Sequence, residues 1–275
     1  MRVRLVLNRR SRRGATLGTT VAQALRACGI EVLERREKTR PDAIVVAGGD
    51  GTFVRAIPAA MELDVPMGLV PLGTFNDLAR TLEIPTDVAA ACALIAAGAT
   101  RTIDVARVNG VYYVNEASIG ASSRITRLQR TSEKQHFGWL AIVASAIRGL
   151  RYVRPFRATI QWNGSGDSMK TIQLTIANSQ RFGGFISVAD AAIDDGQLDC
   201  YAIEARGLFP VVALVAAVIQ HGPSGLPGLR AYRSSAIRIV TPRPHRIAAD
   251  GEPAGSTPAL FEIVPRALKV FSPPC

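Results

Sequence analysis

The sequence predicts an α/β N-terminal domain with a largely parallel open sheet, followed by a mostly antiparallel β domain. Segments typical of strands and of helices alternate up to about residue 100, and short strands dominate after it. The chain has 275 residues, of which 48% are hydrophobic, enough to bury two modest cores. We place the domains at 1–103 and 104–275, with a functional cleft between them.

The first half opens with a strand over residues 2–8 and a helix over 16–30, because β-branched alternation gives way to helical spacing. A second strand is expected over 31–37. Only "KTRPD" separates it from the next strand, which is too short for the crossover helix that two parallel neighbours need. Either that helix has been lost, or the second strand lies at the edge of the sheet.

The third strand begins at Ala43 and runs into "GGDGT" at 48–52, which is followed by a helical stretch. Glycine lets backbone N–H groups approach a ligand, and the start of a helix attracts anions. Short glycine turns also close ordinary α/β loops, so "GGDGT" alone favours phosphate binding and a plain turn about equally. Next come a short buried strand, a turn containing Gly73, and a helix that ends at Gly98.

The second half begins with a β-hairpin that turns at Asn109 and Gly110, a dipeptide typical of two-residue hairpin turns. One helix is expected over 137–153. The remaining segments are short and rich in β-branched residues, which indicates antiparallel strands. They lie at 156–163, 169–179, 197–205, 236–242, 245–252 and 260–271.

The net charge of +11 and the pI near 10.2 favour anionic partners such as nucleic acid, acidic phospholipid or nucleotide. No RNA- or DNA-binding signature accompanies the charge, so nucleic acid is not expected. The four scattered cysteines form no metal-site or disulfide framework. The longest apolar helical stretch, 208–220, is shorter than the roughly 20 residues of a bilayer span. We therefore expect a cytoplasmic protein.

Four short motifs combine small residues with carboxylates or amides: "GGDGT" (48–52), "PLGTFNDLAR" (71–80), "DDGQLD" (194–199) and "DGE" (250–252). In this order they resemble the bacterial diacylglycerol kinase and sphingosine kinase-like lipid kinase family, and the similarity extends over nearly the whole chain. NAD kinases and phosphofructokinases share the GGDG turn, but "PLGTFNDLAR" resembles the lipid kinases. The resemblance implies that ATP, with Mg²⁺, phosphorylates the hydroxyl of a diacylglycerol-like or long-chain-base lipid in phospholipid metabolism.

The resemblance also implies which residues bind the nucleotide and the metal. Glycine N–H groups would contact the phosphates, and carboxylates would hold Mg²⁺ directly or through water. Thr52 and Asp77 could instead cap helices. The nucleotide set is Asn8, Gly48, Gly49, Asp50, Gly51, Thr52, Gly73, Thr74 and Asn76, and the magnesium set is Asp50, Asp77 and Asp104.

By resemblance, "DGE" faces the cleft and supplies the proton acceptor for the attacking hydroxyl. We expect Glu252 to be the base, with Asp250 nearly equal. Asp-Gly is also a strong β-turn pair, so the tripeptide alone would predict a turn. The "DDGQLD" stretch resembles a separate structural metal loop, with Asp195 binding through its carboxylate and Ala192 and Gln197 through carbonyls. An Asp-Gly turn explains it equally well.

Two departures leave alternatives open. The first loop reads "NRRSRRG", with Arg9 where the family commonly has proline, and the helix after residue 37 is missing. The chain could therefore be an inactive nucleotide-binding relative with a regulatory role, or a soluble NAD kinase-like enzyme. As an active lipid kinase it would bind ATP and a lipid at the inner membrane face, with a possible homodimer. The stretch 208–226 would then be a buried helix or an apolar lipid entrance.

Overall fold

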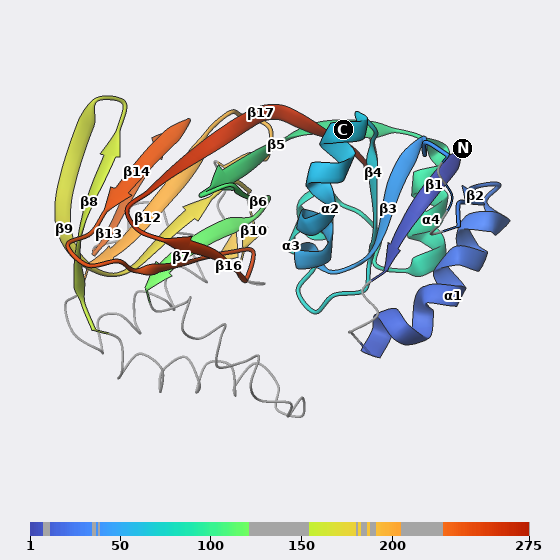
Figure 1. The fold of residues 1–275 in the computed structure, drawn as a ribbon, viewed down its shortest axis with the longest axis horizontal. Helices are drawn as coiled ribbons and strands as arrows, with labels where there is room; N and C mark the ends of the chain where they lie inside the picture. The colour runs from blue at the N-terminus through green and yellow to red at the C-terminus, as the bar shows by residue number, and fades with distance from the viewer. Residues whose placement is uncertain are drawn as a thin grey trace.

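The computed structural model shows an α/β domain beside a domain built of strands (Figure 1). The expectations for Asn8, for the helix over 137–153 and for the apolar stretch over 208–226 lie outside the described residues. Those described are 1–7, 12–34, 37, 39–120, 154–179, 181–182, 186–187, 191–204 and 228–274.

The first domain holds four parallel strands in the order β2-β1-β3-β4. The strand β2 pairs only with β1, with Glu31 opposite Arg2, so β2 and β3 lie on either side of β1. The edge position of the second strand is thereby confirmed. The strands are β1 (Arg2–Leu7), β2 (Glu31–Val32), β3 (Ala43–Gly48) and β4 (Met67–Pro71).

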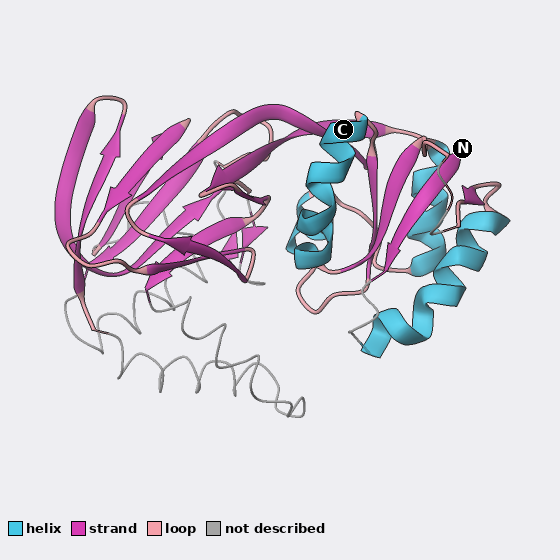
Figure 2. Cartoon of the chain, in the orientation of Figure 1, coloured by secondary structure: helices cyan, strands magenta, loops and turns pink. Residues whose placement is uncertain are grey.

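Helices cover both faces of this sheet (Figure 2). Along β3 the side chains alternate: Ile44 and Val46 pack in the cluster that includes α2, whereas Val45 packs in the cluster with α1 and α4. A strand buried on both faces reads as a continuous apolar run, which is how this segment appears in the sequence. The helices are α1 (Arg12–Ala27), α2 (Asp50–Leu63), α3 (Asp77–Thr81) and α4 (Val88–Ala97).

The second domain is antiparallel, as the sequence predicts, and its core is centred on buried side chains such as Ile160, Leu174 and Phe261. Asn109 and Gly110 both have positive φ and turn the β5–β6 hairpin, which confirms that prediction. Its main strands are β5 (Thr100–Val108), β6 (Val111–Tyr113), β7 (Glu116–Gly120), β8 (Phe156–Trp162), β9 (Ser165–Ala177), β12 (Leu198–Glu204), β13 (Leu229–Ser234), β14 (Ala236–Val240), β15 (Arg246–Ala249), β16 (Glu252–Ser256) and β17 (Ala259–Phe271). A small separate sheet pairs β10 (Arg181–Phe182) with β11 (Ile186–Ser187).

The last strand, β17, joins the two domains (Figure 1). It pairs with β14 and β5 in the antiparallel domain, and near its end Val270 pairs in parallel with Met67 of β4. The expected boundary at residue 103 therefore falls inside β5, whose first residues continue the sheet of the first domain. Of the helices that the structure describes, none has the length and apolar character to cross a bilayer.

Candidate active site

The glycine loop, residues 48–52, connects β3 to α2. Gly48 ends the strand, and a Cβ built on it would lie 2.9 Å from Thr52 Oγ1. The first hydrogen bond of the helix runs from the Thr52 N–H to Gly49 O at 2.9 Å. The amides of Asp50 and Gly51 come before this bond in the chain, at the N-terminus of the helix. The residue before the first helical residue is Gly49, not Thr52, so Thr52 does not cap this helix.

The loop after β4 lies directly against the glycine loop. A Cβ on Gly73 would lie 2.6 Å from Gly49 Cα. The two backbones are therefore in contact, and position 73 has room only for the hydrogen atom of a glycine. Asn76, at φ +52°, closes its own turn: its Oδ1 accepts the Gly73 N–H at 2.9 Å and its Nδ2 donates to Gly73 O at 3.2 Å. Thr74 is exposed in this turn. The carboxyl ends of β3 and β4 thus form one surface, where open α/β sheets bind ligands.

Asp50 connects three segments that the sequence keeps apart. Its carboxylate accepts the backbone N–H groups of Asp77 and Leu78, each at 3.2 Å, and thereby holds the start of α3. The side chain of Asn115, from the second domain, also donates to this carboxylate. Burial raises the pKa of Asp50, while these hydrogen bonds act in the opposite direction. Removing the charge would affect both loops and the domain junction.

The "DGE" tripeptide forms the tight turn between β15 and β16. Asp250 and Gly251 both have positive φ, of 43° and 78°, which confirms the β-turn. The Asp250 carboxylate accepts N–H groups from Val114 at 2.7 Å, Asn115 at 3.1 Å and Glu116 at 3.0 Å. Burial raises the pKa of Asp250 to about 7, and the same hydrogen bonds oppose that rise. Asp250 therefore fastens the turn to the segment before β7.

Glu116 lies beside Asp250, and sequence reasoning missed it. Burial, followed by the nearby charges of Asp250 and Asp77, raises the pKa of Glu116 to about 8. Asp250 accepts three backbone N–H groups, which favour its charged form, whereas burial and the neighbouring carboxylates favour the protonated form of Glu116. A single charge on this pair avoids the repulsion between two neighbouring carboxylates.

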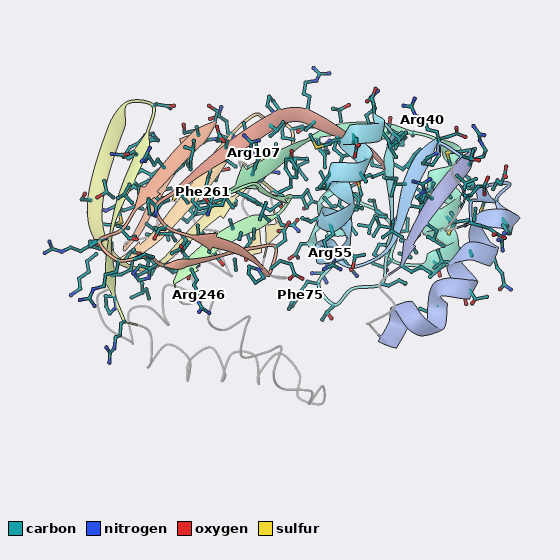
Figure 3. All side chains as sticks on the ribbon, viewed as in Figure 1. Arg40, Arg55, Phe75, Arg107, Arg246 and Phe261 are labelled. Carbon is teal, nitrogen blue, oxygen red and sulfur yellow. The ribbon has the colours of Figure 1, made fainter. Side chains whose placement is uncertain are left out.

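Glu252 stands at the junction, against the first turn of α2. A Cβ on Gly51 would lie 3.6 Å from Glu252 Oε1, and the Glu252 side chain is 34% exposed. Arg55, one turn further along α2, approaches the same carboxylate oxygen at 3.4 Å through Nη1. Sequence reasoning assigned no role to Arg55, although an arginine one turn beyond a glycine loop is a usable signal. Figure 3 labels Arg55 on the part of α2 that faces the antiparallel domain.

The residues around Asp50 fit a magnesium ion, although the described residues contain no group of three or more acidic, histidine or cysteine side chains that could hold a metal. Asn115 is 4% exposed, and its Oδ1 is buried without a hydrogen-bond partner. An orphaned oxygen beside the Asp50 carboxylate is a place where an ion or its bound water would satisfy a polar atom. Carboxylate and amide oxygens are the donors that Mg²⁺ prefers.

Asp104 is engaged with other segments. Its two carboxylate oxygens accept the N–H groups of Gly196 at 2.7 Å and of Arg266 at 2.6 Å. Asn178 links this region to the site, because its Nδ2 donates to the carbonyls of Asp104 at 3.3 Å and Val114 at 3.1 Å. These contacts assign Asp104 to holding the 192–197 loop and the part of β17 around Arg266, where the pairing with β5 shifts its register.

The acidic side chains of the 192–197 loop pair with arginines from neighbouring strands. The Asp195 carboxylate accepts N–H groups from Ala192 at 3.1 Å and Gln197 at 2.9 Å, and it also pairs with Arg233. Gly196 turns the loop at φ +71°, as an Asp-Gly turn requires. The neighbouring Asp194 pairs with Arg101 at 2.7 Å. A metal ion on Asp195 would have to displace a guanidinium, so these contacts fit a turn neutralised by arginine better than they fit a metal loop.

We expect the loop to hold its shape without a divalent cation. EDTA should leave the Tm of the wild-type protein unchanged, whereas Arg233→Ala should lower it by roughly 3 °C, because an exposed ion pair contributes about 1 kcal/mol. Added Ca²⁺ should recover part of that loss. In the control Arg107→Ala, which breaks another exposed pair, Ca²⁺ should have no such effect. A fall in the wild-type Tm in EDTA would contradict the expectation.

Two family models match the chain. The diacylglycerol kinase catalytic domain matches residues 2–108, and the YegS C-terminal NAD kinase beta sandwich-like domain matches residues 115–272. The matched ranges follow the division between the α/β half and the antiparallel half.

Curated proteins and solved structures agree with these matches. A diacylglycerol kinase of Bacillus subtilis (strain 168) is 28% identical over 84% of this chain and 78% of its own. A Klebsiella pneumoniae (strain 342) protein named probable lipid kinase YegS-like is 29% identical over 85% and 78%. The chain spans about half, 54%, of an uncharacterized Synechocystis relative.

Among solved structures, a diacylglycerol kinase from Bacillus anthracis str. Sterne superposes with a TM-score of 0.74 at 22% identity, over 99% of this chain and 97% of that one. An ATP-bound NAD kinase from Archaeoglobus fulgidus superposes with a TM-score of 0.51 at 13% identity, over 99% and 94%. Both superpositions show a shared fold.

Proposed function

Because the chain belongs to the family of diacylglycerol kinases and YegS-like lipid kinases, we propose that it transfers the γ-phosphate of ATP to a lipid hydroxyl. The acceptor would be a diacylglycerol-like or long-chain-base lipid. The observation that carries the proposal is the contact between the glycine loop and the "DGE" turn, where Gly51 and Arg55 meet Glu252. A phosphate group and a proton acceptor can share this junction.

The nucleotide would lie on the surface formed by the two glycine loops. The amides of Asp50 and Gly51 and the start of α2 favour the triphosphate, and Gly49 and Gly73 allow close approach. Asn76 supports this surface by fixing its turn. Asp50 and Asp77, with the Asn115 amide, would hold Mg²⁺. When bound, Mg²⁺ neutralises negative charge on the phosphates.

Glu252 would take the proton from the lipid hydroxyl. The hydroxyl oxygen would bond to the γ-phosphorus as the bond between that phosphorus and ADP breaks. The Glu252 side chain is 34% exposed and lies beside the glycine loop, so a substrate can reach it. Asp250 is the weaker candidate, since its carboxylate oxygens already accept three backbone N–H groups. We assign Asp250 to positioning, because it fixes the turn that presents Glu252.

Association with the membrane follows from the proposed substrate. A net charge of +11 attracts acidic phospholipid headgroups, which would bring the protein to the inner membrane face as a peripheral protein. We place no lipid-binding residue, because the apolar stretch suggested for this role, 208–226, lies outside the described residues.

Label transfer from γ-³²P-ATP to diacylglycerol, sphingosine, ceramide, undecaprenol and NAD tests the proposal. We expect label on one lipid class, presented in mixed micelles with Mg²⁺, and none on NAD. The fold shared with an NAD kinase makes NAD the informative soluble acceptor, and label on it would replace the lipid assignment. ATP binding with no labelled acceptor would favour an inactive, regulatory relative.

A further inference from the structure

We propose that Arg55 binds the terminal phosphate of the nucleotide, and that it leaves Glu252 when it does so. This inference deepens the proposed function and rests on it. It assigns a nucleotide-binding role to a residue outside the four sequence motifs, and it explains why a basic side chain sits on the expected catalytic base.

The position of Arg55 supports the inference. Its Nη2 lies 3.3 Å from Thr52 Oγ1, at the glycine loop, while Nη1 lies 3.4 Å from Glu252 Oε1. The guanidinium therefore spans the two groups between which the terminal phosphate would lie. Both contacts are long for charge-assisted hydrogen bonds, and the side chain is 57% exposed, so a stronger acceptor can take it over at small cost.

The chemistry of phosphate makes it that stronger acceptor. Arginine binds phosphate oxygens through two parallel N–H groups, and a guanidinium stabilises the charge of a phosphoryl group in transfer. ADP lacks the terminal phosphate, so Arg55 should distinguish ATP from ADP. Once the guanidinium is on the phosphate, its positive charge no longer pairs with Glu252, which favours proton acceptance by that carboxylate. Nucleotide binding and the basicity of Glu252 are then linked.

A second ion pair in the same protein serves as a matched control. Arg107 Nη2 lies 3.1 Å from Glu262 Oε2, and both side chains are exposed. This pair joins β5 to β17, away from the glycine loop, and Figure 3 labels Arg107 on the antiparallel domain. Arg107→Ala removes an exposed arginine–glutamate pair without touching the proposed nucleotide site.

The test is calorimetric titration of the full chain with a nonhydrolysable ATP analogue and with ADP, each with Mg²⁺. For Arg55→Ala we expect the Kd of the analogue to rise about tenfold and the Kd of ADP to change less than twofold. Arg55→Lys keeps a charge without the two-pronged geometry, so its loss should be smaller. Arg107→Ala should change neither Kd.

Two results would overturn the inference and leave the proposed function intact. One is an equal loss of affinity for both nucleotides in Arg55→Ala and Arg55→Lys. The other is no loss for either nucleotide, which would make the arginine only a link between the domains. If the wild-type protein binds neither nucleotide, the proposed function itself fails. Should Arg55→Ala fail to fold, the ratio of the two affinities in Arg55→Lys decides.

Discussion

Glu252→Gln should lower phosphoryl transfer by about 10²- to 10⁴-fold, the range typical of removing a general base. The amide has almost the same shape as the carboxylate but cannot accept the hydroxyl proton. Nucleotide binding should persist, because Glu252 contacts Arg55 and the start of α2 but does not belong to the glycine loop. Steady-state label transfer to the preferred lipid measures the first effect, and ATP titration measures the second.

Glu262→Gln is the matched control, since Glu262 is also an exposed glutamate paired with an arginine. It should transfer phosphate at the wild-type rate. If Glu252→Gln keeps activity within tenfold of wild type, another group takes the proton. Asp250→Asn would then be the next variant to measure, and a larger loss there would move the base to Asp250.

Asp50→Asn should lower transfer by on the order of 10²-fold or more, because it removes the glycine-loop carboxylate that we propose as a Mg²⁺ ligand. The Mg²⁺ concentration for half-maximal transfer should rise as well. The variant also weakens the hydrogen bonds to the Asp77 and Leu78 amides, which should cost about 1 kcal/mol of unfolding free energy. Label transfer at varied Mg²⁺, with thermal unfolding, measures both effects.

Asp87→Asn separates the two effects. Asp87 caps α4 through a 2.9 Å hydrogen bond from the Ala90 N–H, so the same substitution alters a cap without touching the site. It should change stability slightly and leave the Mg²⁺ dependence of transfer unchanged. A wild-type Mg²⁺ dependence in Asp50→Asn would contradict the assignment of Asp50 as a metal residue.

Local chemistry explains what could be read from the sequence. The buried run before Gly48, the helix ending at Gly98 and the hairpin turn at Asn109 are set by neighbouring residues, and the structure confirms each. Membership of the family could be read from motif order because each motif is short and continuous. The edge position of β2 could not be decided, since it depends on which side of β1 the strand pairs.

The missed features depend on contacts between residues far apart in the chain. Asp250 fastens Val114 because β15 pairs with β7, a register that no local pattern specifies. Arg55 meets Glu252 only after β17 brings the antiparallel domain against α2. The Asp195 loop resembles a metal loop in its own residues, while Arg233 comes from a different strand. Sequence motifs predicted the two glycine loops and the "DGE" turn, whereas the contacts of Glu116 and Arg55 depend on the arrangement of the strands.

The central claim is that one triphosphate contacts both domains. A crystal structure of the protein with Mg²⁺ and a nonhydrolysable ATP analogue tests this claim most directly. We expect the triphosphate against the amides of Asp50 and Gly51, with Glu252 and the Arg55 guanidinium facing its terminal phosphate. A triphosphate bound elsewhere, or one whose terminal phosphate points away from Glu252, would contradict the account.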